Sequence, residues 1–246
     1  ETTLIEAGER ALEAADSKAA FFAALSHEIR NPMNGVIGLI DSLTHTRLDE
    51  DQRYQLGVVA RSAKMSLAVL NDALDYAGIK AGRLALNRSP SEILPLAEDL
   101  ALMYAPVAAE RGLAFQLSVA PDLPLLLIDP LRVRQIAANF IANAIRHTEQ
   151  GFVRLSIAGC AQSEKCWKLV VEVQDSGQGI PDLERKQTFQ PFDSPGGPGA
   201  PGTGLGLTVC RTLAEAIGGQ IEVGSAQSGG SHFRFTLDAE SQPAPE

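Results

Sequence analysis

Apolar residues recur every seven positions in two long segments near the start of the chain, and this spacing constrains the fold more than any other feature. The first row is formed by Phe22, Ile29, Val36 and Leu43. The second row is formed by Leu56, Ala63, Leu70 and Ala77. Residues seven apart lie on one side of an α-helix, so each segment is predicted to be a helix with a narrow apolar seam.

The polar stretch TRLDED separates the two segments. We therefore predict a first helix that runs to about Thr46 and a second helix from about Asp51 to Lys80, which Asp49 or Asp51 would cap. Such a hairpin leaves half of its apolar seam uncovered, and a second copy would cover it in a four-helix bundle. The sequence therefore predicts a homodimer through residues 1–80.

His27 occupies an unusual place in the first helix. Counted from Phe22 as heptad position a, His27 falls at position f, opposite the seam, so its ring is expected to face away from the apolar core. Glu28 can take a proton from the imidazole and leave the other ring nitrogen free to attack an electrophile. Pro32 is expected to bend the helix, because it lacks an N–H and its ring clashes with the preceding turn. The alternative is an ordinary solvated His–Glu pair.

From about Leu84 the periodicity changes to short strands that alternate with helices. Strands are predicted at 84–88, 113–119, 125–129, 152–160, 168–175, 221–224 and 232–237. Helices are predicted at 91–111, with Ser91 as the cap, at 130–147, with proline at its first position, and at 204–217, stopped by Gly218. This order predicts a mixed sheet covered on one face by helices, an α/β sandwich.

Two polar patterns in this second half suggest a binding site. Gln135, Asn139, Asn143 and His147 are four apart and share one face of the predicted helix. A solvated face is the alternative, but such faces favour Glu and Lys, whereas Asn offers a carbonyl oxygen to a hard cation and an amide to a phosphate. Farther on, glycines at the start of a predicted helix in GTGLGL allow close approach of phosphate to free N–H groups.

Several of these stretches resemble the motifs of histidine kinases. HEIRNPMNGVIG resembles the H box, DPLRVRQIAANFIANAIRHT the N box, and DSGQGI the first glycine box. TFQPF, with Phe189 and Phe192, resembles the F box, and GTGLGL the second glycine box. Gly229–Gly230 followed by HFRFTL resembles the last glycine box and final strand. The motifs occur in the order of that family and span nearly the whole chain.

This resemblance implies roles for particular residues. His27 would be the phospho-acceptor, Glu28 its base, and Asn31, where threonine is commoner, is associated with dephosphorylation of the partner. Asp175 would accept a hydrogen bond from the adenine amino group, and Asn139 would ligate Mg²⁺. The implied ATP-binding residues are Asn139, Asn143, Arg146, Asp175, Gly177, Gly179, Gly202, Thr203, Gly204, Leu205 and Gly206. Arg146 replaces the usual lysine and His147 the usual Phe or Tyr.

The resemblance also implies two domains and an activity. Residues 1–82 would form the dimerisation and histidine phosphotransfer hairpin, residues 83–240 the ATP-binding domain of the GHKL type, and residues 241–246 a linker. The expected function is that of a sensor histidine kinase of the hybrid type in a two-component system. The chain would phosphorylate itself on His27 with ATP and Mg²⁺, transfer the phosphate to an aspartate of a response regulator or receiver domain, and act as a phosphatase in reverse.

A departure from the family keeps an alternative open. The segment from Asp193 to Pro201 would form the lid over the nucleotide, and it contains no Lys or Arg. Because phosphoryl transfer depends on charge neutralisation, the chain could instead be a catalytically weak relative that acts by binding another kinase. A chaperone or topoisomerase ATPase of the same superfamily is disfavoured, since those proteins lack the His-bearing hairpin.

Composition narrows the setting. The formal net charge is −9 and no basic run occurs, which argues against a nucleic-acid partner. No apolar stretch approaches the about 20 residues that span a bilayer. The three cysteines are odd in number and lack metal-ligand spacing, which favours a reducing compartment. We therefore expect a cytoplasmic segment, compatible with an inner-membrane sensor.

Overall fold

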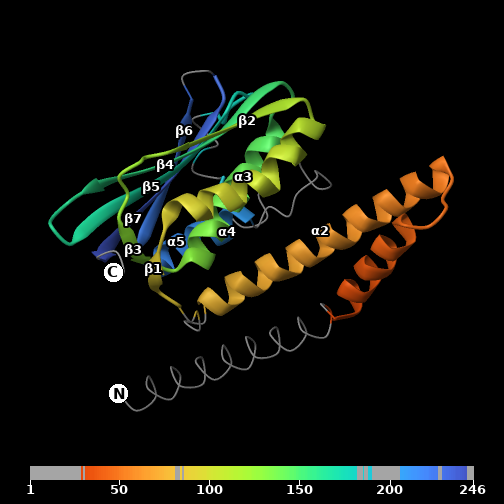
Figure 1. The fold of residues 1–246 in the computed structure, drawn as a ribbon, viewed down its shortest axis with the longest axis horizontal. Helices are drawn as coiled ribbons and strands as arrows, with labels where there is room; N and C mark the ends of the chain where they lie inside the picture. Colours follow the sequence, from red (N-terminus) through yellow and green to blue (C-terminus); the bar gives the residue numbers. More distant parts are fainter. Residues whose placement is uncertain are drawn as a thin grey trace, which may run out of the picture. The chain divides into compact units, whose positions relative to one another are not determined.

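A computed structural model of the chain describes residues 29, 31–80, 84, 86–181, 185, 188–189, 206–226 and 229–242. The chain divides into two compact units, Glu1–Leu84 and Ala85–Glu246. The first unit is helical and the second contains a sheet with helices, as the change in periodicity predicts (Figure 1).

The helical unit contains a hairpin. A first helix runs through residues 31–44, and α2 (Glu50–Lys80) follows after a short connection. Asp49 caps α2, because its Oδ1 accepts a hydrogen bond from Gln52 N at 2.8 Å while Gln52 Oε1 accepts one from Asp49 N at 3.2 Å. The predicted capping by Asp49 is confirmed. The first helix ends two residues earlier than predicted, since Thr46 N already bonds to Leu43 O in a turn.

An apolar row of the first helix stays exposed in the single chain. Ile29, Val36 and Leu43 are 41%, 41% and 46% exposed, and Leu39 is 68% exposed. Ile40 and Ala63 are buried, so the hairpin does have an inner face. The exposed row belongs to the predicted heptad seam, which one copy of the hairpin therefore leaves uncovered.

The second unit is built on one mixed sheet. Its strands are β1 (Ser89–Ser91), β2 (Leu113–Val119), β3 (Leu125–Ile128), β4 (Gly151–Ala161), β5 (Cys166–Asp175), β6 (Gly219–Ser225) and β7 (Ser231–Gln242). The strand order is β1-β3-β7-β5-β4-β2, and β6 also pairs with β7. The pairing of β2 with β4 is parallel and the other pairings are antiparallel.

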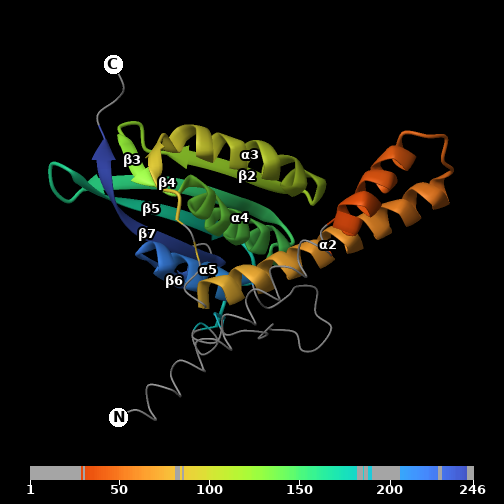
Figure 2. The same ribbon diagram turned by 90° about the horizontal axis from the view of Figure 1, so that it is seen from below.

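Three helices, α3 (Ile93–Glu110), α4 (Pro130–His147) and α5 (Gly206–Ile217), lie on one side of the sheet (Figures 1 and 2). Along β5 the odd-numbered residues from Leu169 to Asp175 are buried, whereas the even-numbered residues are only half-buried. This alternation is typical of a sheet with one covered face. In the core the ring centres of Phe140 on α4 and Phe233 on β7 lie 5.2 Å apart.

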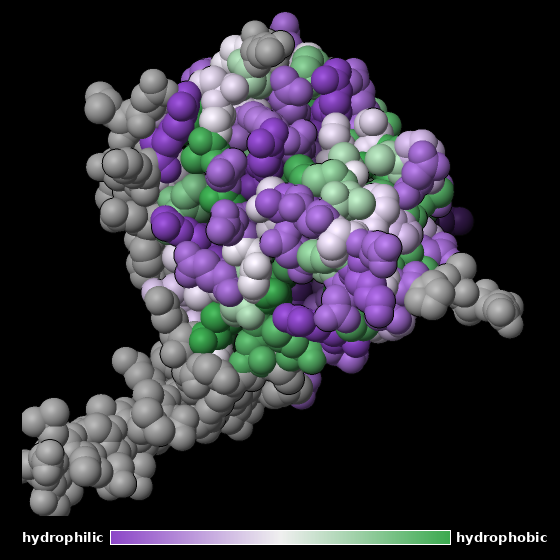
Figure 3. Space-filling view, turned by 90° about the vertical axis from the view of Figure 1, so that its left-hand side faces the viewer, coloured by the Kyte–Doolittle hydropathy of each residue, from purple (hydrophilic) through white to green (hydrophobic). Residues whose placement is uncertain are grey.

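The opposite face of the sheet carries paired polar side chains. Arg234 Nε donates to Glu172 Oε1 at 2.6 Å, and Arg154 Nε donates to Gln116 Oε1 at 2.8 Å. Residues 160–165, around the turn between β4 and β5, are exposed. Seen from the side of this turn, the surface is mainly hydrophilic with smaller hydrophobic groups between (Figure 3). Within the described residues, no helix is both long and apolar enough to cross a membrane.

Some boundaries differ from the predictions. The predicted strand at 84–88 is wrong for its described residues, and the strand lies instead at Ser89–Ser91. Ser91 is therefore a strand residue, and Glu92 precedes α3 without a side-chain cap. Residues 241 and 242, assigned to the linker, extend β7 because Leu125 and Leu126 of β3 pair with them. The predicted stop of α5 is confirmed, since Gly218 has a φ of +87° that favours glycine.

Candidate functional site

Helix α4 presents the predicted polar stripe at one edge of the core. Asp129 caps the helix, because its Oδ1 accepts a hydrogen bond from Arg132 N at 3.2 Å and its Oδ2 accepts one from Asn87 N at 2.9 Å. Ile136, Phe140 and Ala144 are fully buried and fix the apolar face of α4 against the sheet. The rotation of the helix is thereby set, and the stripe that contains Asn139 and Asn143 lies at the border of the core.

The two asparagines of this stripe carry polar groups that are free to bind a ligand. Asn139 and Asn143 are half-buried. Within the described part of the chain, neither side chain makes a hydrogen bond. Because half-buried amides normally have partners, this pair is well suited to a polar ligand or a hydrated cation.

Asp175 ends β5 and its carboxylate is held rigidly. The residue is 2% exposed. Its Oδ1 accepts hydrogen bonds from Gly177 N at 2.8 Å and from Ser231 N at 3.0 Å. Among the described residues, no hydrogen bond reaches the other oxygen, Oδ2. Two backbone donors therefore fix the carboxylate and leave one oxygen as an acceptor for a ligand.

Close backbone approaches bring three segments together around Asp175. A β-carbon on Gly177 would collide with the main-chain carbonyl of His147, at the end of α4. A β-carbon on Gly179 would lie 2.7 Å from the oxygen of Gly229. The end of α4, the turn after β5 and the residues before β7 thus meet, and glycine is required where they do.

Ser176 adds a contact that the sequence did not predict. Its Oγ accepts a hydrogen bond from Phe152 N at 2.9 Å and lies 3.1 Å from Gln150 O, to which it can donate. The hydroxyl therefore ties the turn after β5 to the start of β4. A serine in a turn is too common a signal to reveal this role, and its partner lies 24 residues away.

Replacement of Gly230 by alanine is expected to disturb this arrangement. The added methyl group would lie 2.6 Å from Asp175 Oδ1 and closer still to the Asp175 carbonyl, so β7 must move away from β5. We expect a loss of about 2 kcal/mol in the free energy of unfolding and roughly 10-fold weaker ATP binding, which corresponds to about 1.4 kcal/mol. Urea unfolding and nucleotide titration measure the two effects.

Gly224→Ala is the matched control. A β-carbon at Gly224, which pairs with His232 of β7, would meet no atom within 4 Å. This variant is expected to unfold and bind nucleotide like the unsubstituted chain. Equal behaviour of the two alanine variants would contradict the tight contact at Gly230.

The environment of His147 favours its neutral form. His147 is exposed overall, but desolvation of its ring by the neighbouring chain lowers its pKa below the ordinary value, the charge of Arg146 lowers the pKa further, and the charge of Asp175 partly opposes both. The end of α4 is near this carboxylate in the backbone as well, since a β-carbon on Gly177 would contact both the His147 carbonyl and Asp175 Oδ1.

A pH dependence follows from this shift. The folded state holds a proton on His147 less well than the unfolded chain, in which the pKa is about 6.5. The contribution of neutral His147 to the free energy of unfolding is fully present above the pKa of the unfolded chain. It is lost as the pH falls through the lower pKa of the folded state. We expect the free energy of unfolding to decline more steeply below pH ~6.5 in the unsubstituted chain than in His147→Asn. Parallel profiles in urea titrations would contradict the assignment.

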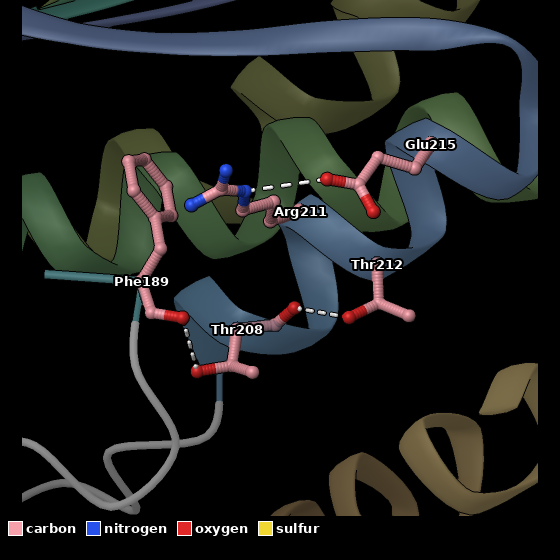
Figure 4. A network of polar contacts seen from close by, with 5 residues as sticks. All are labelled: Phe189, Thr208, Arg211, Thr212 and Glu215. Atoms are coloured by element: carbon pink, nitrogen blue, oxygen red, sulfur yellow. Dashed lines mark hydrogen bonds and ion pairs between the residues drawn. The ribbon is translucent and has the colours of Figure 1, made fainter. Parts of the chain in front are cut away.

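The start of α5 is attached to the F-box segment. Thr208 Oγ1 donates to the carbonyl oxygen of Phe189 at 3.1 Å, and the guanidinium of Arg211 lies 5.8 Å from the centre of the Phe189 ring (Figure 4). Gly206, one of the predicted phosphate contacts, is the first residue of α5. This attachment was not predicted from the sequence.

Several predicted residues lie outside the described part of the chain. They are His27, Glu28, Phe192, the lid at 193–201, Gly202, Thr203, Gly204 and Leu205. Asn31 is described and is exposed on the first helix, and Arg146 is exposed near the end of α4. The structure therefore brings together one part of the predicted site: the end of α4, the helix that carries the asparagine stripe, meets the turn formed by Asp175 and its glycines.

A separate cavity lies far from Asp175. It has a volume of about 260 Å³ and is lined by residues that include Arg88, Asp129, Cys166 and Glu240. Cys166 and Asp175 are the first and last residues of β5, which has ten residues, so about 30 Å of strand separates the two places. Within the described residues, no group of three or more His, Cys, Asp or Glu residues could hold a metal ion.

Comparison with known proteins identifies the two units. Residues 17–82, which include His27, match the His Kinase A (phospho-acceptor) domain. Residues 128–241 match the histidine kinase-, DNA gyrase B- and HSP90-like ATPase family. The fold and these matches thus define the class: a domain of the phospho-acceptor family followed by a domain of the ATPase family. The chain belongs to the sensor histidine kinase family.

Individual relatives agree with this assignment. The signal transduction histidine-protein kinase BarA of Escherichia coli is 36% identical over 241 residues, which are 96% of this chain and 26% of BarA. The sensor histidine kinase GacS of Pseudomonas protegens is 36% identical over 97% of this chain and 27% of GacS. The crystal structure of full-length ShkA in complex with AMPPNP superposes with a TM-score of 0.74 and 32% identity, over 92% of this chain and 47% of ShkA. The chain thus spans about a quarter of the length of these curated relatives.

Proposed function

We propose that the chain is the catalytic core of a sensor histidine kinase, which transfers the γ-phosphate of ATP to His27 and then to an aspartate of a receiver domain or response regulator. The observation that carries the proposal is the geometry of Asp175. Its buried carboxylate is fixed by two backbone N–H groups, with one oxygen left as an acceptor, and the turn that follows it meets the end of α4.

This geometry suits adenine as the base. The free oxygen of Asp175 can accept a hydrogen bond from the exocyclic amino group of adenine, whereas guanine presents a carbonyl oxygen that a carboxylate repels. By the family resemblance Asn143 and Arg146 approach the phosphates, together with the glycines from Gly202 to Gly206. The start of α5 would add free N–H groups and the positive end of the helix dipole.

The residues present also fit a magnesium ion that arrives with the nucleotide. Mg²⁺ in nucleotide sites takes few protein ligands and completes its coordination with phosphate oxygens and water. Asn139 offers a side-chain oxygen without a competing hydrogen bond among the described residues. When bound there, the ion would neutralise charge on the phosphates.

The proposed chemistry at His27 conserves atoms and charge. One imidazole nitrogen attacks the γ-phosphorus, a nitrogen–phosphorus bond forms, and the bond between phosphorus and the β-γ bridging oxygen breaks to release ADP. Glu28 takes the proton of the imidazole. In the phosphatase reaction, Asn31 would position a water molecule that hydrolyses the phosphorylated aspartate of the partner.

The hairpin supports assembly as a homodimer. Ile29, Val36 and Leu43 leave more than 40% of their area exposed along one row of the first helix. Covering such a row removes apolar surface from water and therefore favours association with a second hairpin. We therefore propose that two hairpins form a four-helix bundle, in a cytoplasmic segment of a hybrid sensor anchored in the inner membrane.

Transfer of label tests the proposal. The chain incubated with Mg²⁺ and ATP labelled on the γ-phosphate is expected to become radioactive, whereas ATP labelled on the α-phosphate is expected to leave it unlabelled. The second candidate, a catalytically weak regulator, is favoured by the lid without Lys or Arg. Binding of Mg·ATP without transfer, or no binding at all, would favour that alternative over the kinase.

A further inference from the structure

Ser176 alters the pairing of β4 with β5 at the point where β5 ends. The last pair in the register is Val153 with Asp175, so Phe152 and Ser176 stand opposite each other one position farther on. Ser176 N donates to Phe152 O at 3.2 Å, as in a hydrogen-bonded antiparallel pair. In such a pair the second bond runs from Phe152 N to the carbonyl of Ser176. Here Phe152 N donates instead to the Ser176 hydroxyl at 2.9 Å, so the side chain takes the place of its own carbonyl.

This exchange lets the backbone leave the strand directly after Asp175. Gly177 N returns to Asp175 Oδ1 at 2.8 Å, which makes a turn closed by the aspartate side chain. The Ser176 carbonyl is not needed as an acceptor for Phe152 N, so the peptide group that contains it can follow the turn. One hydroxyl therefore allows the strand pairing and the turn to coexist.

The surroundings of this hydroxyl leave room for it. A β-carbon on Gly151 would collide with Ser176 Oγ, and Gly151 has a φ of +107° that favours glycine. The same Oγ lies 3.1 Å from Gln150 O, to which it can donate. The hydroxyl thus has an acceptor and a donor partner, both in the short stretch of chain where β4 begins.

Loss of the hydroxyl would be felt at Asp175. Phe152 N would need another acceptor, because an unpaired N–H inside a sheet is costly. The acceptor that the strand pairing itself offers is the carbonyl of residue 176. This carbonyl and Gly177 N belong to one planar peptide group, so turning the carbonyl toward Phe152 N reorients the N–H that holds Asp175 Oδ1.

We propose that Ser176 is a positioning residue for the recognition of adenine: its hydroxyl pairs with Phe152 N and thereby leaves the following peptide group free to hold the Asp175 carboxylate toward the adenine amino group. The inference rests on the proposed function, because it takes ATP to be the ligand and Asp175 to be the residue that contacts the base. Ser176 acts through Gly177 and Asp175 and is assigned no contact with the nucleotide.

Two nucleotides that differ in one group test this role on the whole chain. Purine riboside 5′-triphosphate carries a hydrogen where ATP carries the amino group. The unsubstituted chain is expected to bind Mg·ATP about 10- to 100-fold more tightly than the magnesium complex of this analogue. In Ser176→Ala the dissociation constant of Mg·ATP should rise about 3- to 10-fold and that of the analogue less than about 2-fold. The KM for ATP should rise like the dissociation constant, while kcat at saturating ATP changes little.

Two control variants separate the hydroxyl from a general loss of stability. Ser176→Thr keeps the hydroxyl and should keep the preference for ATP over the analogue. Ile128→Val removes a methyl group from a buried position of β3 and should lower the melting temperature. Strand β3 pairs with residues 240–242 of β7, whereas Asp175 is bonded to Ser231 at the other end of that strand, so this variant should also keep the preference.

Three results would overturn the inference. The first is an unchanged preference for ATP in Ser176→Ala, which includes an equal loss of affinity for both nucleotides. The second is a preference that narrows as much in Ile128→Val, and the third is one that narrows as much in Ser176→Thr. Failure of the unsubstituted chain to bind Mg·ATP, or equal binding of both nucleotides by it, would instead overturn the proposed function or its assignment of Asp175, and this inference with it.

Discussion

Replacement of His27 by glutamine is expected to abolish incorporation of phosphate from ATP while Mg·ATP binding stays unchanged. Glutamine approximates the size and polarity of the ring but has no nucleophilic nitrogen, because its amide lone pair is delocalised. His27 is predicted at heptad position f, away from the seam, so the substitution should not weaken the hairpin. Phosphate incorporation and nucleotide titration on the same preparation measure the two quantities.

His45→Gln is the matched control. His45 is an exposed histidine in the turn directly after the first helix, and its ring nitrogen Nδ1 lies 2.8 Å from Asp41 O. This variant should incorporate phosphate like the unsubstituted chain. Label that persists in His27→Gln, or that disappears equally in His45→Gln, would show that His27 is not the acceptor.

Replacement of Asp175 by asparagine is expected to weaken Mg·ATP binding about 100-fold, or roughly 2.7 kcal/mol. The oxygen that accepts hydrogen bonds from Gly177 N and Ser231 N can be retained by the amide. The amide NH₂ then takes the place of Oδ2 and meets the adenine amino group donor to donor. Because the hydrogen bonds from Gly177 N and Ser231 N are kept, the free energy of unfolding should change far less than the affinity for Mg·ATP.

Two comparisons separate this effect from a general change in charge. Asp238→Asn removes the same charge from an exposed position on β7 and should leave ATP binding unaltered. The unsubstituted chain should bind Mg·GTP much more weakly than Mg·ATP, and Asp175→Asn should narrow that preference. Wild-type affinity for ATP in Asp175→Asn would exclude Asp175 as the base-reading residue.

Local signals made much of the fold predictable. The bounds of α4, Pro130–His147, match the prediction because proline at its first position and Asp129 as its cap mark the start. The bounds of β2 match as well, since Gly112 precedes the strand with a φ of +72°. Strand β1 was misplaced because it has only three residues and forms by pairing with β3, a partner that local sequence does not reveal.

The site was predictable in its residue types and not in its tertiary contacts. Polar residues four positions apart on α4 indicated the stripe that contains Asn139 and Asn143. The backbone N–H of Ser231, which donates to Asp175, lies 56 residues away in the sequence. Because any residue except proline can supply a backbone N–H, the residue type at position 231 does not indicate this contact. The same holds for the Phe189 carbonyl that Thr208 contacts, because a backbone acceptor exists at every position.

The most direct measurement of the central claim is the location of the phosphate after the chain has reacted with Mg·ATP. Digestion under alkaline conditions, which preserve phosphohistidine, followed by mass spectrometry of the peptides would identify the modified residue. We expect one phosphorylated residue, His27, whose phosphate is lost on acid treatment. Phosphate on any other residue, or an acid-stable phosphate, would contradict it.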